Sequence, residues 1–95
     1  MDQKIKKKWV RALLSGKYKQ ARGVLLRSKT GGMCCLGVLA KIQGCSVDLL
    51  RDKVDVVPDG YAAGISLDMQ TQLAAMNDRK RHNFKQIAEF IKEFL

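Results

Sequence analysis

Three cysteines and one histidine are the thiol and imidazole groups of this 95-residue sequence, the side chains first considered for a zinc site or a nucleophile. Cys34 and Cys35 are adjacent, Cys45 follows ten residues later, and His82 lies in a charged run near the end. Structural zinc sites prefer cysteine pairs with two residues between them, and adjacent cysteines cannot easily share one tetrahedron. We therefore expect no metal and no cofactor.

The adjacent cysteines are also poor candidates for a disulfide or a nucleophile. They lie in the apolar run 33–42, where burial raises a thiol pKa and keeps the unreactive protonated form. Neighbouring cysteines bridge only through a strained ring. The sequence contains no serine-nucleophile elbow, phosphate-binding loop or zinc-protease motif. We expect buried, reduced thiols and a protein that is not an enzyme.

Positive charge is the stronger functional signal. Residues 1–27 hold nine Lys and Arg and one acid, Asp2, so that nearly all of the net charge of +9 lies in this segment. Such a density of bases attracts phosphate backbones, nucleotides or an acidic protein face. A purely solubilising surface is the alternative. The candidate residues for binding an anionic partner are Lys4, Lys7, Lys8, Arg11, Lys17, Lys19, Arg22 and Arg27.

Four helices are predicted to position these residues. Apolar residues at helical spacing predict a first helix over 3–15, with Trp9 as its core anchor. The run 33–42, closed by Gly44, predicts a buried second helix. Ser66 is the expected N-cap of a third helix that ends near Met76, broken by Asn77 and Asp78. A capping box of Asn83 and Gln86 then begins a last helix, whose apolar face is predicted to join the core. That face consists of Phe84, Ile87, Ala88, Ile91, Phe94 and Leu95.

Short apolar stretches between the helices predict strands. Residues 24–26 are typical of a strand that could pair with 33–35, and Val54 and Val56 suggest another before the turn at 58–60. Gly37 would mark a close backbone approach. The predicted fold is a single α+β domain over 1–95, with about four helices and a short two- or three-stranded sheet in the middle. No run has the ~18 apolar residues of a membrane span, and no signal peptide is evident, so we expect a cytoplasmic protein.

Two stretches of the sequence resemble a recurrent pattern of small bacteriophage and prophage proteins. The first contains "SGKYKQ" at 15–20 and "CCLGVL" at 34–39, and the second contains "LAAMND" at 73–78 and "NFKQIAEFIKEFL" at 83–95. Ala40 and Met33 depart from the pattern, which has a third cysteine and an aromatic residue there. The resemblance implies a phage origin and transfers no activity.

We therefore expect a phage accessory protein that binds a bacterial host target stoichiometrically in the host cytoplasm. A counter-defence inhibitor, of the anti-CRISPR or anti-signalling kind, is the leading hypothesis, with a host protein or nucleoprotein complex as partner. A sequence-tolerant nucleic-acid-binding protein is one alternative, and a sponge for a nucleotide defence signal is another. Membrane binding is not expected, because residues 3–15 offer few bulky apolar residues for insertion.

Overall fold

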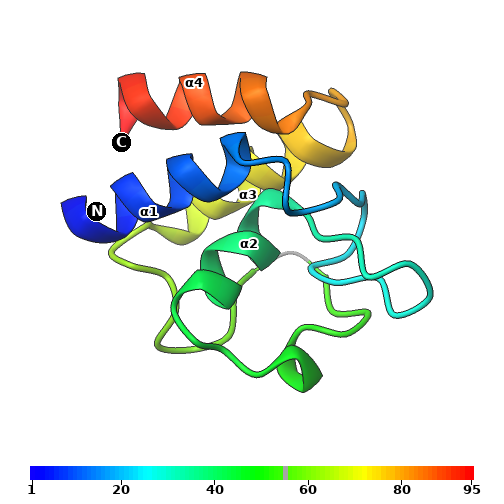
Figure 1. Ribbon diagram of the computed structural model, residues 1–95. Helices are drawn as coiled ribbons and strands as arrows, with labels where there is room; N and C mark the ends of the chain where they lie inside the picture. Colours follow the sequence, from blue (N-terminus) through cyan, green and yellow to red (C-terminus); the bar gives the residue numbers. More distant parts are fainter. Residues whose placement is uncertain (55) are drawn as a thin grey trace.

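The computed structural model describes residues 1–54 and 56–95, and its regular structure is helical throughout. The helices are α1 (Gln3–Leu14), α2 (Cys35–Ile42), α3 (Leu67–Asp78) and α4 (Phe84–Phe94), with a single 3-10 turn, η1 (Val47–Leu49). The four predicted helices are thus confirmed. They gather on one side of the molecule, and the loops on either side of α2 occupy the other side (Figure 1).

Side-chain caps fix where three of the helices begin. Asp2 accepts a hydrogen bond from the Ile5 N–H at the start of α1, and Ser66 accepts one from the Met69 N–H at the start of α3. Asn83 and Gln86 form the predicted capping box of α4. Each cap satisfies an amide that has no partner within the helix, which stabilises that end by about 1 kcal/mol.

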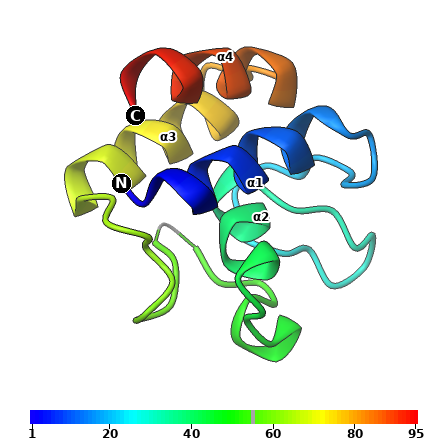
Figure 2. The same ribbon diagram turned by 60° about the vertical axis from the view of Figure 1, so that its left-hand side comes forward.

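The first and last helices lie side by side and run in opposite directions, so that both chain ends meet at one end of the pair (Figures 1 and 2). Trp9 is completely buried, as predicted, and its indole N–H donates to the Cys35 carbonyl of α2 over 2.9 Å. Ile87 and Ile91 of α4 are buried in the same cluster, which confirms part of the predicted core face. Phe94, predicted to join that face, is 62% exposed.

The predicted sheet is wrong, because the described residues contain no β-strand and therefore no α+β architecture. The segment around Leu26 does pair with Met33 and with Arg51, but each pairing is an isolated bridge of one residue. Gly23, Gly31 and Asp52 have positive φ angles, and these turns bend the chain away before a ladder can continue. Asp55, inside the predicted strand around Val54 and Val56, lies outside the described residues.

Gly37 marks a close backbone approach, as predicted. A Cβ atom at this position would overlap the carbonyl oxygen of Leu25, so α2 packs directly on the backbone of the preceding segment. The amide of Cys34 donates to the same Leu25 carbonyl over 3.3 Å. Only glycine allows this contact, because it has no side chain to separate the two backbones.

Helix α3 continues through the residues that were predicted to break it. Asn77 is completely buried and Asp78 is the last helical residue. Asparagine is unfavourable inside a helix when its side chain forms hydrogen bonds with nearby backbone groups, because these compete with the hydrogen bonds of the helix. Here the Asn77 side chain binds distant groups instead, so the helix extends to Asp78.

Candidate functional site

Four of the candidate bases share the exposed side of α1. Lys4, Lys7, Lys8 and Arg11 recur at spacings of three and four residues, which places them on one side of a helix, and all four are exposed. Within residues 1–54 and 56–95 none of them forms an ion pair or a side-chain hydrogen bond. We call this set the basic face. Its charges are free to meet an anionic partner.

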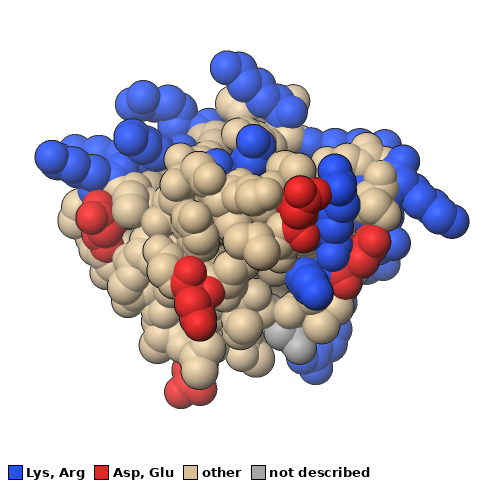
Figure 3. Space-filling view, turned by 90° about the horizontal axis from the view of Figure 1, so that it is seen from below, with Lys and Arg blue, Asp and Glu red and all other residues tan. Residues whose placement is uncertain are grey.

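The charge is unevenly distributed over the surface. Figure 3 views the molecule from the side of the irregular loops, where Asp and Glu are scattered over a largely uncharged surface. Lys and Arg project mainly along the edges of that view. The surface made by the loops is therefore a weaker candidate for binding anions than the basic face.

Beside the basic face, α1 and one residue of α4, Lys92, line an open groove of about 580 Å³. Val10 and the 45% exposed Leu14 give it an apolar floor. We call it the α1/α4 groove, and its lining consists of Lys6, Lys7, Val10, Arg11, Leu14, Ser15 and Lys92. Four of these seven residues are basic and none is acidic, so the groove combines an apolar floor with a cationic rim.

Lys6 and Lys92 line this groove although the sequence pattern did not indicate them as candidates. The Lys6 amine donates to the Lys92 carbonyl over 3.2 Å, at the carboxyl end of α4, where a cation meets the helix dipole favourably. Lys92 forms an exposed ion pair with Glu89 over 3.6 Å. Their role could be found only by knowing that the first and last helices are neighbours.

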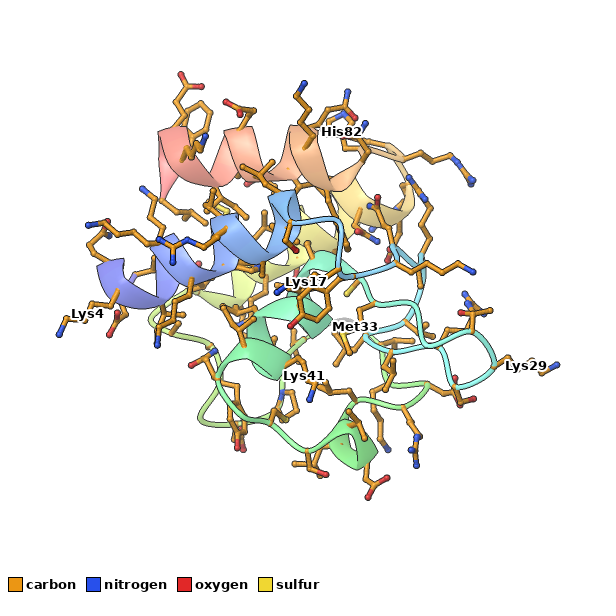
Figure 4. All side chains as sticks on the ribbon, in the orientation of Figure 1. Lys4, Lys17, Lys29, Met33, Lys41 and His82 are labelled. Carbon is orange, nitrogen blue, oxygen red and sulfur yellow. The ribbon has the colours of Figure 1, made fainter. Side chains whose placement is uncertain are left out.

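The other candidate bases do not join the basic face. Figure 4 shows Lys4 near the start of α1 and Lys17 beyond its other end, and Lys19 is likewise exposed in the following loop. Arg22 donates to the Arg81 carbonyl over 3.1 Å, and Arg27 donates to the Arg22 carbonyl over 2.6 Å. The structure therefore leaves four of the eight candidates on α1 and two, Lys17 and Lys19, exposed in the following loop. The remaining two, Arg22 and Arg27, belong to a second cluster beside the α3–α4 turn.

A buried amide holds that second cluster in place. The Asn77 Oδ1 accepts hydrogen bonds from Gln20 Nε2 over 2.8 Å and from the Cys35 N–H over 3.3 Å. Its Nδ2 donates to the Ala21 carbonyl over 2.8 Å, and Gln20 Nε2 also donates to the His82 carbonyl over 2.8 Å. Asn77 thus connects α3 to the loop 15–34 and supplies an acceptor to an N-terminal amide of α2.

The cysteines are free and buried, as predicted. Burial raises the pKa of Cys34 to about 11 and raises the pKa of Cys35 well above its ordinary value. Both thiols are therefore protonated near neutral pH, which makes them weak nucleophiles. In the described part of the chain, no three side chains of the His, Cys, Asp or Glu type come together as a metal site.

His82, the remaining candidate for chemistry, is half-buried at the α3–α4 turn (Figure 4). Its Nδ1 is inaccessible to solvent and forms no hydrogen bond to any described residue. Its backbone amide donates to the Met76 carbonyl over 2.9 Å. His82 therefore follows the end of α3, and its backbone hydrogen bond to Met76 helps to hold the turn.

Together these features define a small helical domain with a basic face, an adjoining apolar groove and buried thiols. Residues 1–55 match the model of a protein family described as "Domain of unknown function (DUF8296)", and the chain belongs to this family. The match includes α1 and α2, and thus the basic face, but not α4. No curated protein and no solved structure matches the chain. In the described residues, no helix has both the length and the apolar character needed to span a membrane.

Proposed function

We propose that this protein acts by stoichiometric binding, with the basic face of α1 contacting an anionic surface on its partner. The proposed partner is a protein or nucleoprotein complex of a bacterial host, bound in the host cytoplasm. The sequence resemblance to small bacteriophage and prophage proteins supports a role as a phage accessory protein. Inhibition of a host defence system is the consequence that we propose for this binding.

The observation that carries the proposal is the arrangement of Lys4, Lys7, Lys8 and Arg11. They lie on one exposed helix face, and no acidic side chain of the described residues pairs with them. Unpaired like charges within one or two helical turns repel each other and add little to folding stability. An anionic partner relieves that repulsion, which makes the face suited to binding.

A capture experiment tests this proposal. The tagged full chain is incubated with bacterial lysate, and bound proteins are quantified by mass spectrometry before and after nuclease treatment. The test variant carries Lys7→Glu and Arg11→Glu, and the matched control carries Lys29→Glu and Lys41→Glu, two exposed bases outside the basic face (Figure 4). We expect a host protein that resists nuclease and is lost only with the α1 variant. Equal capture by both variants would refute the role of the basic face.

A sequence-tolerant nucleic-acid-binding function is the second candidate. The observation that favours it is the cluster in which Arg22, Arg27 and Arg81 meet through backbone contacts, beside Arg79 and Lys80. Each phosphate contact releases counterions, so ~3–5 contacts to duplex DNA give a log–log salt slope of about −3 to −5. Replacing Arg79 and Lys80, two exposed bases of this cluster, should flatten that slope by roughly 2. Binding to DNA that is weak and independent of salt would eliminate this candidate.

A further inference from the structure

The α1/α4 groove combines an exposed apolar side chain with a rim of positive charge. Its floor contains Leu14, a large apolar side chain that is 45% exposed although it lies in a helix that packs on the core. Its rim carries Lys6, Lys7, Arg11 and Lys92. An exposed apolar residue gains nothing from water, so the groove would be stabilised by an occupant that covers Leu14 and neutralises the rim.

We propose that the α1/α4 groove binds an acidic amphipathic helix of the partner protein. This inference rests on the proposed function and names the chemistry of its partner. The apolar side of such a helix covers Val10 and Leu14, and acids along both edges face the lysines and Arg11. Recognition of an amphipathic helix in an apolar groove is a recurrent mode of peptide binding.

The dimensions of the groove agree with a short helix. Its lining on α1 extends from Lys6 to Ser15, nine residue steps, or about 14 Å at 1.5 Å per residue. That length corresponds to between two and three helical turns. Because α1 and α4 already lie antiparallel (Figures 1 and 2), a third helix can pack along the seam between them with ridges-into-grooves geometry.

The charge and the apolar floor of the groove favour an acidic helix over a second copy of the chain or a nucleic acid. A second copy of the chain would bring its own basic face toward the rim, and like charges would oppose the contact. A nucleic-acid backbone would satisfy the rim but would leave the apolar floor uncovered. Glu89 forms an exposed pair with Lys92 of the rim, and an exposed pair is worth at most about 1 kcal/mol. A partner carboxylate can therefore replace it.

Synthetic peptides test the proposal directly. The probe is a fluorescein-labelled 16-residue peptide with leucines along one helical face and glutamates on both flanks. One control peptide has the same composition in an order that gives no apolar face, and another has lysine in place of every glutamate. We expect the acidic amphipathic peptide to bind at least about tenfold more tightly than either control, and to gain helical circular dichroism when bound.

Variants of the full chain locate the binding site. Leu14→Ser removes the apolar floor, and its control is Leu67→Ser, because Leu67 is 66% exposed on α3 and does not line the groove. As in the capture experiment, the charge variant carries Lys7→Glu and Arg11→Glu, and its control carries Lys29→Glu and Lys41→Glu. We expect Leu14→Ser and the Lys7→Glu, Arg11→Glu variant each to weaken peptide binding about tenfold or more, and neither control to change it beyond about twofold. Unchanged thermal unfolding of each variant shows that its fold is intact.

The outcomes separate this inference from the proposed function. Equal binding of the amphipathic and reordered peptides, or unaltered binding by Leu14→Ser, would overturn the groove proposal. If Leu14→Ser still captures the host protein while Lys7→Glu, Arg11→Glu does not, the proposed function stands and the groove proposal fails. A 20-base-pair DNA duplex is also added to the bound peptide. If the duplex displaces the peptide, and its binding depends on Lys7 and Arg11 but not on Leu14, the groove proposal is overturned and the nucleic-acid function is supported.

Discussion

Two regions of this molecule are held together in different ways. The antiparallel pair α1 and α4 is stabilised by apolar residues at helical spacing and by side-chain caps at each start. The irregular region, residues 15–34 and 43–66, contains no helix longer than the 3-10 turn η1 among its described residues. Isolated backbone pairs and side-chain amides hold it together. The helical pair is thus specified locally, whereas the irregular region depends on contacts between distant residues.

Amide side chains make several of those distant contacts. The Gln70 Oε1 accepts from the Val57 N–H over 3.0 Å, and Gln70 Nε2 donates to the Ile65 carbonyl over 3.3 Å. Gln43 Nε2 donates to the Tyr61 carbonyl over 2.7 Å, and Asn77 binds the loop that contains Ala21. Each amide supplies both a donor and an acceptor, and can therefore fix an irregular backbone that lacks regular pairing.

The largest loss of folding stability is expected from a substitution in the pair α1 and α4. Ile91→Asp places a carboxylate at a completely buried position of α4, at a cost of more than about 4 kcal/mol. A domain of this size is stable by only about 5–15 kcal/mol, so we expect the variant to be largely unfolded by circular dichroism. Phe94→Asp in the same helix is the control and should cost about 1 kcal/mol or less, because Phe94 is mostly exposed. A native-like Ile91→Asp protein would show that this face is not core.

The next largest loss of stability is expected from a substitution where α2 packs on the irregular region. Gly37→Ala forces a methyl group into the Leu25 carbonyl, so the helix must move away and lose its hydrogen bond from Cys34. We expect a loss of about 3 kcal/mol in urea unfolding. Gly16→Ala is the control, since Gly16 has a φ of 78° and no atom near the added methyl, so only about 1 kcal/mol of backbone strain is expected. Equal losses in both variants would contradict the close approach.

Asn77→Ala tests the amide network itself. The substitution leaves the Cys35 N–H and the Ala21 carbonyl without their partner in a buried environment. We expect a loss of about 2–4 kcal/mol in unfolding free energy, and faster hydrogen exchange in the loop 15–34 than in α4. Gln72→Ala, at an exposed position of the same helix, should change stability by less than about 0.5 kcal/mol. Uniform exchange throughout the chain would argue against two differently stabilised regions.

The buried thiols predict a dependence of stability on pH. Burial raises the pKa of Cys34 from 9.0 to about 11, so the unfolded chain loses this proton at a lower pH than the folded one. Stability from this thiol is therefore fully present below pH 9 and falls as the pH rises to about 11, by about 2.7 kcal/mol for a shift of two pH units. Urea titrations at several pH values measure the decline. A variant with Cys34→Ala and Cys35→Ala should not show this loss of stability between pH 9 and about 11. An identical decline in that variant would be inconsistent with buried thiols.

The elements predicted correctly from the sequence are those with a local signal. The spacing of Ile87 and Ile91, the Asn83–Gln86 capping box and the apolar run around Cys35 each act within a few residues. Short apolar stretches predict a sheet, but such stretches form single bridges when glycines turn the chain between them. Gly37 is a long-range feature that the sequence does indicate, because a glycine inside a buried apolar run favours direct contact with another backbone.

The sequence indicates only part of the surfaces that we propose for binding, for the same reason. Helical spacing is enough to place Lys7 and Arg11 on one side of α1. Nothing local indicates that Lys92 lies beside them or that Arg22 turns toward Arg81, since both depend on how α3 and α4 pack. The local propensity of Asn77 predicts a helix break, whereas its partners Gln20 and Ala21 are more than fifty residues away.

The most direct test of the binding function is a titration of the purified host protein from the capture experiment with the full chain at several salt concentrations. We predict one chain bound per target, and an affinity that falls as salt rises because the basic face meets acidic groups. The variant with Lys7→Glu and Arg11→Glu should bind at least about tenfold more weakly at low salt, with a smaller salt dependence. A folded variant that binds with unchanged affinity at every salt concentration would contradict the assignment of α1 as the binding surface.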